Sequence, residues 1–371
     1  MIPVNLPRFA GNEKAYLAEC IDSGWISSEG PFVRRFEQDM AALCQRRHAI
    51  AVSNGTVALE LAFHVLGLAP GDEVILPACT IISCAAAIVR AGGVPVPCDV
   101  DPGHWNLDAA AVEAAITPRT RALLVVHTYG MACDMTALGA VADRHGLRVV
   151  EDAAEAHGQS CHGKPCGGFG LLSTFSFYAN KHVAAGEGGM VLTDDEALAQ
   201  RCRSLRNLAF GREVRFRHEE LGWNYRLGNL QAAVAVAQLE QLPTTIASKQ
   251  TAARRYTDAF RDLDLLQLPL DRTPWCDNHY WVYGVVLRPE AALNAAAAMR
   301  ALRDLGVESR PFFWPLDQQP ALRQFASASR PPCPVAHRLA DRGFYIPSGP
   351  GMDHPTQARV IAAVRSVVGH A

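Results

Sequence analysis

The chain has 371 residues, of which 49% are hydrophobic and 19% are charged. This length and balance exclude a disordered chain and predict one large domain with a smaller one beside it. The formal net charge of −2 gives no global attraction for nucleic acid or an anionic membrane, so we expect neither as a partner. Small anionic substrates remain possible, since they need only a local cluster of basic residues.

The cysteine pattern and the N-terminal sequence bear on the cellular compartment. The 11 cysteines are scattered along the chain, which favours a reducing environment. Their tightest group, Cys161–Cys166 with His157 nearby, could bind zinc, but no second pair accompanies it at structural-zinc spacing. Buried, inert thiols are therefore favoured, and no metal is predicted. The first residues show no secretory pattern and no stretch is apolar enough to span a bilayer, so we expect a cytoplasmic protein.

Short apolar runs alternate with helical stretches between about residues 48 and 195. Several of the runs are apolar throughout, which is typical of strands in a parallel sheet with helices on both faces. The pattern predicts an α/β domain. The expected strands are Ala49–Val52, Val74–Leu76, Val94–Pro97, Ala122–His127, Leu147–Glu151, Ser173–Phe177 and Met190–Thr193, and the expected helices include Val57–Leu66, Leu107–Ala115 and Met135–His145.

The pattern changes after residue 200. We expect one long helix at Gly228–Leu242, ended by Pro243, and another at Lys249–Phe260. A strand at Tyr280–Leu287, a helix at Ala291–Leu305 and a C-terminal helix from about Thr356 should follow. These elements predict a large α/β domain at residues 1–245 and a smaller α+β domain at residues 246–371.

Residues Ser53 to Val57 join the first strand to its helix. Because the first amides of a helix lack partners and carry the positive end of its dipole, this junction suits a phosphate. Gly55 allows close approach of the backbone, and the Thr56 hydroxyl can donate a hydrogen bond. The alternative is an ordinary helix cap.

Two further residues follow strands. Glu151 and Asp152 end an apolar strand and should point to opposite faces of the sheet, with Asp152 where α/β folds place ligands. Asp152 could stabilise a cationic ring nitrogen, or could cap the next helix. Lys181 follows the run that contains Ser176 and precedes Gly186–Gly189. In a poorly solvated pocket such a lysine becomes a nucleophile towards an aldehyde, whereas the alternative is a surface lysine.

The order of these parts is more specific than any one of them. A phosphate cradle, a strand-end aspartate and a post-strand lysine occur in this order in fold-type I enzymes that use pyridoxal 5′-phosphate. That cofactor needs an anchor for its phosphate, an acid that keeps its pyridine nitrogen protonated, and an amine for covalent attachment.

Longer segments resemble one family. The chain is similar nearly end to end to the DegT/DnrJ/EryC1/StrS family of sugar aminotransferases, and within it most strongly to the members that make GDP-perosamine. The segments that carry the resemblance are Gly24–Gly30, Ser53–Leu59, Pro70–Ile75, Glu151–Gly158, Thr174–Tyr178, Gly186–Met190, Gly222–Arg226 and Arg310–Phe313.

The resemblance implies a fold and a set of roles. The fold would be that of fold-type I aminotransferases, with a mostly parallel central sheet flanked by helices and a smaller C-terminal α+β domain. Lys181 would be the catalytic lysine that binds the cofactor as a Schiff base, Asp152 would pair with the ring nitrogen, and Glu155 would lie near the 3-hydroxyl. The phosphate would contact Gly55, Thr56, Ser176 and, from the neighbouring subunit of a homodimer with shared active sites, Asn224. By charge and position, Arg226 and Arg310 are candidates for the substrate's diphosphate.

The implied reaction transfers the amino group of glutamate to GDP-4-keto-6-deoxymannose and gives GDP-perosamine. Related enzymes with histidine at the lysine position are dehydratases, so Lys181 favours amino transfer. Ile81 stands where many members stack an aromatic residue on the cofactor ring, and it can cover that face only by apolar contact. The alternatives are amination at C3, a dTDP- or UDP-linked sugar, and a catalytically silent relative that acts as a regulator.

Overall fold

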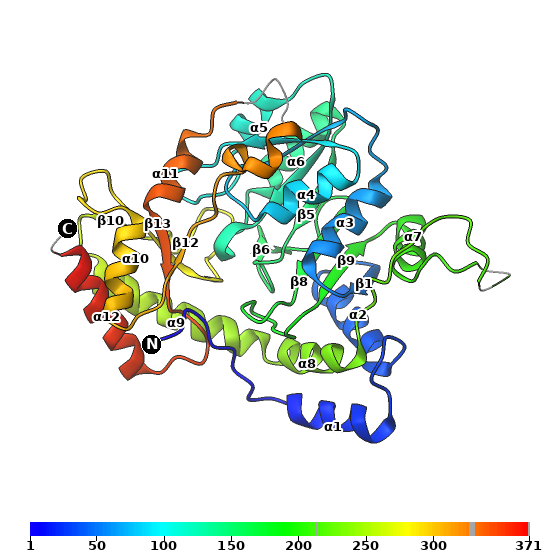
Figure 1. The fold of residues 1–371 in the computed structure, drawn as a ribbon, viewed down its shortest axis with the longest axis horizontal. Coiled ribbons are helices and arrows are strands. Elements are labelled where there is room, and N and C mark those ends of the chain that lie inside the picture. The colour runs from blue at the N-terminus through cyan, green and yellow to red at the C-terminus, as the bar shows by residue number, and fades with distance from the viewer. Residues whose placement is uncertain (212–213, 215, 326–330, 370–371) are drawn as a thin grey trace.

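The computed structural model describes residues 1–211, 214, 216–325 and 331–369, and its centre is a seven-stranded sheet (Figure 1). The strand order is β1-β9-β8-β5-β4-β2-β3, and within this sheet only β9 runs antiparallel to its neighbours. The fold class predicted from the sequence is therefore confirmed. The strands are β1 (His48–Val52), β2 (Glu73–Pro77), β3 (Val94–Cys98), β4 (Thr120–Val126), β5 (Arg148–Asp152), β8 (Leu172–Ser176) and β9 (Gly189–Thr193).

Helices cover both faces of this sheet, as continuously apolar strands require. Along β1, Ala49 and Ala51 belong to one hydrophobic cluster, whereas Ile50 and Val52 belong to another. Because side chains alternate along a strand, β1 supplies both clusters, and β9 does the same through Met190 and Val191. One face packs against α2 (Pro31–Leu43), α5 (Ala109–Ala115), α6 (Met135–His145) and α8 (Asn229–Glu240), and the other against α3 (Gly55–Leu66), α4 (Ile82–Arg90) and α7 (Glu196–Arg206).

A smaller lobe follows, built on a four-stranded antiparallel sheet in the order β10-β11-β13-β12. The N-terminal segment joins it, since Ile2 pairs with Val307 and lies in the lobe's hydrophobic cluster. The division at residue 245 stays a prediction, because one helix, α9, runs across it. The elements of this part are α9 (Leu242–Phe260), β10 (Leu266–Gln267), β11 (Tyr283–Leu287), α10 (Ala295–Asp304), β12 (Arg310–Pro311), α11 (Pro334–Arg342), β13 (Gly343–Ile346) and α12 (His354–Val368).

The helices around Pro243 differ from the sequence-based expectation. The first ends at Glu240, and the second begins at Leu242 rather than at Lys249. Pro243 lies in the first turn of α9, where a missing backbone N–H costs nothing. Proline therefore starts a helix here rather than merely ending one. In Figure 1, α8 and α9 run in succession along one side of the molecule and link its two lobes.

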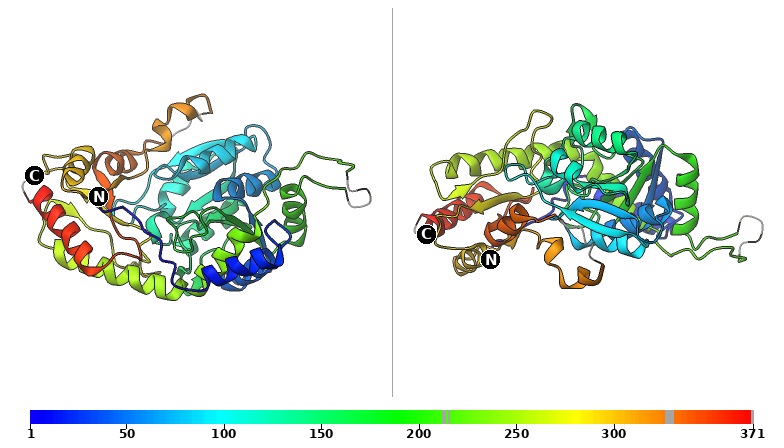
Figure 2. Two further views of the ribbon diagram at one scale, coloured as in Figure 1. Left: turned by 60° about the horizontal axis from the view of Figure 1, so that its bottom comes forward. Right: turned by 90° about the horizontal axis from the view of Figure 1, so that it is seen from above.

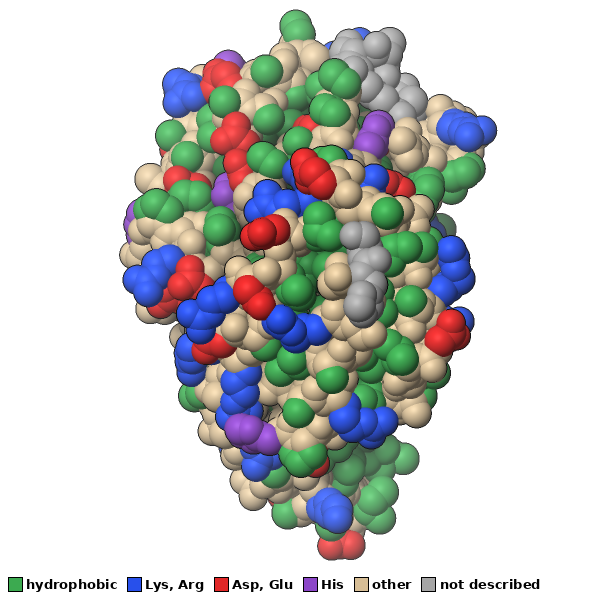
Figure 3. Space-filling view, turned by 90° about the vertical axis from the view of Figure 1, so that its left-hand side faces the viewer, with side chains coloured by type: hydrophobic (Ala, Val, Ile, Leu, Met, Phe, Trp, Pro, Cys, Tyr) green, Lys and Arg blue, Asp and Glu red, His purple; other side chains and the backbone are tan. Residues whose placement is uncertain are grey.

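The remaining elements lie at the periphery. The loop between α7 and α8 projects away from the body of the molecule (Figures 1 and 2). On the face in Figure 3, acidic and basic side chains are interspersed rather than gathered by sign. Among the described residues, no helix is both long enough and apolar enough to cross a membrane. The other elements are α1 (Glu13–Ser23), the short 3-10 helices Thr128–Gly130, Leu316–Gln318 and Pro320–Phe325, and the hairpin of β6 (Ser160–Cys161) and β7 (Lys164–Pro165).

Candidate active site

A cavity of about 340 Å³ opens where β5 and β8 end, between the large sheet and the smaller lobe. Its position at the carboxyl ends of parallel strands is where open α/β sheets bind ligands. Seven of the ten residues predicted from the sequence line it, although they come from five separate segments of the chain. They are Gly55, Thr56, Ile81, Asp152, Glu155, Ser176 and Lys181.

The N-terminus of α3 forms one wall of the cavity. Asn54 caps the helix by accepting a hydrogen bond from the Val57 amide at 3.0 Å, and the amides of Gly55 and Thr56 have no partner within the described residues. A Cβ at position 55 would lie 2.6 Å from the Ser176 Cβ, so only glycine fits there. Two unpaired amides beside a serine and a threonine hydroxyl form a site suited to an anion.

Asp152 forms the floor of the cavity, and its neighbour Glu151 faces the other side of the sheet as predicted. Asp152 is 3% exposed. It accepts hydrogen bonds from the Ala154 amide at 3.0 Å and the Cys84 thiol at 3.5 Å. Burial raises the pKa of Asp152, while the Ala154 amide and the Lys181 ammonium oppose that rise. A cation placed above this carboxylate would therefore stabilise its charged form.

Lys181 follows β8 and points into the cavity. Its Nζ lies 3.3 Å from Oε1 of Glu155 and 3.8 Å from the centre of the Trp281 ring. The Glu155 Oε2 accepts a hydrogen bond from the Tyr129 amide at 2.8 Å. Burial raises the pKa of Glu155 against the effect of the Lys181 ammonium. A carboxylate and an aromatic face thus hold the amine in a largely enclosed position.

Several lining residues were missed from the sequence. Ser83, whose hydroxyl lies 3.0 Å from that of Thr56, adds a polar group to the anion site. The smaller lobe supplies Trp281, Phe313 and Tyr345 as an aromatic wall. No local signal marks these three residues, because they approach Lys181 only through the packing of one lobe against the other.

The structure does not bring the remaining three predicted residues into the cavity. Asn224 is exposed at the base of the projecting loop. Arg226 pairs with Val52 across a bridge and donates to Asn207 at 2.8 Å. Arg310, with a side chain 59% exposed, forms an ion pair with Glu308 and lies beside Tyr345 in the neighbouring strand. Arg226 and Arg310 thus lie next to segments that line the cavity, but not in its wall.

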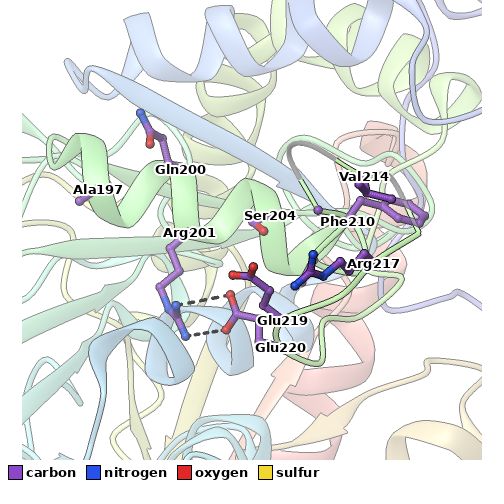
Figure 4. A pocket seen from close by; sticks show the side chains of 11 residues that line it. Ala197, Gln200, Arg201, Ser204, Phe210, Val214, Arg217, Glu219 and Glu220 are labelled. Atoms are coloured by element: carbon purple, nitrogen blue, oxygen red, sulfur yellow. Dashed lines mark hydrogen bonds and ion pairs between the residues drawn. The ribbon is translucent and has the colours of Figure 1, made fainter.

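A larger pocket of about 530 Å³ lies beside α7 and the projecting loop (Figure 4). Two of its charged groups are partners of each other, since Arg201 binds Glu220 at 2.9 Å and 3.5 Å through two nitrogens. Arg217 and Glu219 lie nearby on the loop. None of the residues predicted to act in catalysis lines this pocket, so size does not identify the active site. The smaller cavity contains the reactive amine and the two buried carboxylates.

Comparison with known proteins agrees with this arrangement. The model of the DegT/DnrJ/EryC1/StrS aminotransferase family matches residues 7–365. The chain is 40% identical to the GDP-perosamine synthase of Caulobacter vibrioides, over 99% of this chain and 98% of that one. It is 38% identical to the enzyme of the same name from Vibrio cholerae, over 95% of both chains.

A solved structure supports the same relationship. The aminotransferase TlmJ from Streptoalloteichus hindustanus superposes with a TM-score of 0.92 at 30% identity, over 100% of this chain and 99% of that one. Sequence and structure therefore agree over almost the whole length. The chain belongs to the DegT/DnrJ/EryC1/StrS family of aminotransferases, which use pyridoxal phosphate.

Proposed function

We propose that this enzyme transfers the amino group of glutamate to GDP-4-keto-6-deoxymannose and so makes GDP-perosamine. The observation that carries the proposal is the similarity to two GDP-perosamine synthases at 38% and 40% identity over nearly the full length. The cavity adds a chemical argument, because its amine, carboxylates and anion site are the groups that a transaminase needs.

The residues of the cavity fit pyridoxal phosphate. The phosphate would bind the free amides of Gly55 and Thr56 and the hydroxyl of Ser176, a pocket that a single added Cβ would close. The ring nitrogen would face Asp152, and Ile81 would cover one face of the ring. When bound, the cofactor supplies an electron sink that stabilises negative charge at the reacting carbon.

The chain's own groups account for the other tasks. Asp152, buried and held by Ala154 and Cys84, is oriented to keep a ring nitrogen protonated. Lys181 is placed to carry a proton between donor and acceptor carbons, since its amine reaches the open cavity. Glu155 holds that amine when it is protonated, and it would lie near the cofactor's 3-hydroxyl. The aromatic wall excludes water from the proton transfer.

A second copy of the chain would complete the site. Within the described lining residues Lys181 is the only cation, whereas a sugar nucleotide carries a diphosphate. In a homodimer, the exposed Asn224, which pairs with Asn207 just after α7, would contact the partner's phosphate site. We assign Arg226 and Arg310 to the substrate's diphosphate, because both are basic and both neighbour the cavity.

The test is incubation with GDP-4-keto-6-deoxymannose and glutamate, followed by mass spectrometry and NMR of the product. The expected product carries the amine at C4, with one 2-oxoglutarate released per sugar. An amine at C3, or turnover only with a dTDP- or UDP-linked sugar, would change the substrate and leave the family unaltered. Failure of glutamate to convert the bound cofactor would contradict the enzyme assignment itself.

A further inference from the structure

Three zinc-ligand residues lie together away from the active-site cavity. They are Asp134, which precedes α6, and the adjacent pair Cys161 and His162 in the β6–β7 hairpin. One carboxylate oxygen, the thiol sulfur and one ring nitrogen all lie within 4.8 Å of one another. From the sequence, only the segment Cys161–Cys166 suggests a metal site. The fold brings a third ligand, Asp134, to this segment, although Asp134 lies 27 residues before Cys161 in the chain.

The geometry is close to that of a metal centre. Because the three donor atoms are no more than 4.8 Å apart, one point lies at most about 2.8 Å from each of them. Zn–ligand bonds are about 2.0–2.3 Å long, so this distance is only slightly too large. A small rotation of each side chain closes that gap. No hydrogen bond or ion pair joins the three groups to one another in the part of the chain described, so they face the same space without satisfying each other.

The backbone around this group is fixed by other contacts. Asp134 uses one oxygen, Oδ1, to cap α6 by accepting from the Thr136 and Ala137 amides, each at 3.0 Å, which leaves Oδ2 for a ligand. His162 and Gly163 both have positive φ, as a two-residue hairpin turn requires. The His162 amide donates to the Trp275 carbonyl at 2.9 Å. The three donors are therefore held on two segments whose backbones are fixed by other contacts.

The second cluster of potential ligands behaves differently. His127, Glu151 and Cys166 also lie within 4.8 Å of one another. There, however, His127 binds Glu151 at 2.8 Å, and Glu151 accepts the Gly167 and Phe169 amides at 2.7 Å and 2.9 Å. The ligand atoms of His127 and Glu151 are thus occupied by the fold, and all three residues are buried. We therefore interpret this cluster as a structural hydrogen-bond network. It shows that three potential ligands can lie close together without being available to a metal ion.

We propose that Asp134, Cys161 and His162 bind one Zn²⁺, with water as the fourth ligand. Cys161 is 1% exposed whereas His162 lies at the surface, so one side of the ion would be open to solvent. The Zn–S bond forms as the thiol S–H bond breaks and its proton passes to water. Thiolate, carboxylate and Zn²⁺ together carry no net charge, and the ion would tie the hairpin to the start of α6.

The backbone amides of Met135 and Thr136 donate towards the Cys161 sulfur. Those two amides, at the N-terminus of α6, would stabilise the bound thiolate. The proposal thus predicts proton release on binding in addition to a stoichiometry of one ion per chain.

The experiment uses untagged holoenzyme that has been treated with a chelator and then titrated with zinc chloride in a calorimeter. Wild type should bind one Zn²⁺ per chain, and zinc should raise its thermal midpoint. Cys161→Ser should lose the binding, and His162→Ala should weaken it at least about tenfold. Cys166→Ser is the matched control, since it removes the other thiol of the same segment and should bind zinc as wild type does.

Three outcomes would overturn the proposal, and the first two are no saturable binding to wild type and equal binding to wild type and His162→Ala. Because His162 is exposed, an unchanged thermal midpoint without zinc would show that the variant is folded. If only Cys166→Ser lost zinc binding, the ion would be assigned to the buried cluster of His127, Glu151 and Cys166, which would contradict the proposal. The cofactor's absorbance and the sugar reaction are read separately, so failure here leaves the proposed function untouched.

Discussion

At the scale of single residues, adjacent carboxylates in β5 show how position decides chemistry. Glu151 and Asp152 are both almost fully buried, at 0% and 3% exposure. Glu151 is saturated by His127 and two backbone amides, whereas Asp152 faces the cavity with only an amide and a thiol as partners. A carboxylate is therefore structural on one face of the sheet and available for a ligand on the other.

Asp152→Asn should weaken catalysis far more than folding. The amide keeps the shape of the side chain but cannot favour a protonated ring nitrogen, and a charge-assisted hydrogen bond is worth about 1.5–3 kcal/mol. A loss of that size corresponds to a fall in kcat of roughly 10- to 150-fold. Single-turnover kinetics with glutamate would measure it.

The control for this prediction is Glu151→Gln, which removes the neighbouring charge. Its new amide would face two backbone N–H groups, so it should lower the thermal midpoint and leave the half-reaction of the folded protein nearly unchanged. Parental turnover by Asp152→Asn would mean that the ring nitrogen has another partner.

At the scale of elements, the start of α3 is shaped by the strand beside it. Gly55→Ala would place a Cβ 2.6 Å from that of Ser176, against the floor of the anion site. We expect this variant to lose cofactor affinity by at least about tenfold while it remains folded, measured by equilibrium dialysis and absorbance. Gly139→Ala is the matched control, because a Cβ added there would have no atom within 4 Å outside the backbone of its own helix, α6. It should stabilise the protein slightly and bind cofactor normally.

Helix α9 contains a buried cation that gives stability a pH dependence. Lys249 is 4% exposed and donates to the Ser348 carbonyl at 2.9 Å, and within the described residues it has no carboxylate partner. Burial lowers the pKa of Lys249 to about 7, against about 10.4 in an unfolded chain. The cost of the buried charge is complete below pH 7 and disappears as the pH rises towards the unfolded value.

Lys249→Met removes that dependence. Between pH 7 and 10 the unfolded wild-type chain binds more protons than the folded one. Its free energy of unfolding should therefore rise, relative to the variant, by up to about 1.4 kcal/mol per pH unit. Urea titrations of both proteins at pH 7, 8 and 9 would measure the difference. Parallel pH profiles would show that Lys249 is charged in the folded protein throughout this range.

Local patterns predicted the elements better than they predicted the contacts between them. The central strands and α3, α5 and α6 lie within a few residues of their expected bounds, because their apolar runs are long and bounded by turn residues. The expected start of the second helix at Lys249 was wrong, because Pro243 is compatible both with the end of one helix and with the first turn of the next. The aromatic wall of the cavity and the third zinc ligand depend on long-range packing, which no local pattern contains.

At the scale of the whole molecule, the active-site cavity and the loop beyond α7 both bear on the proposed homodimer. Among the lining residues that the structure describes, Lys181 is the one cation for a substrate with several negative charges. On the loop beyond α7, Phe216 is 77% and Leu221 90% exposed in the single chain. Exposed apolar side chains on a projecting segment are typical of an interface between subunits. Both features are explained if the loop crosses to a second copy, with Asn224 at its base facing the partner's phosphate site.

This arrangement predicts complementation between two inactive variants. Asn224→Asp would set a negative charge against the phosphate across the interface, and Lys181→Ala removes the catalytic amine within its own chain. In a mixed dimer, one active site combines Lys181 of one chain with Asn224 of the other and is intact. The second active site carries both substitutions and is inactive. Random exchange at equal concentrations makes half of the dimers mixed, so activity should recover to about a quarter of the wild-type value.

The recovery would be measured as product formation before and after exchange. Native mass spectrometry of a mass-labelled chain would follow the exchange itself. Mixed dimers without activity would place Asn224 in the same chain's site, or in neither.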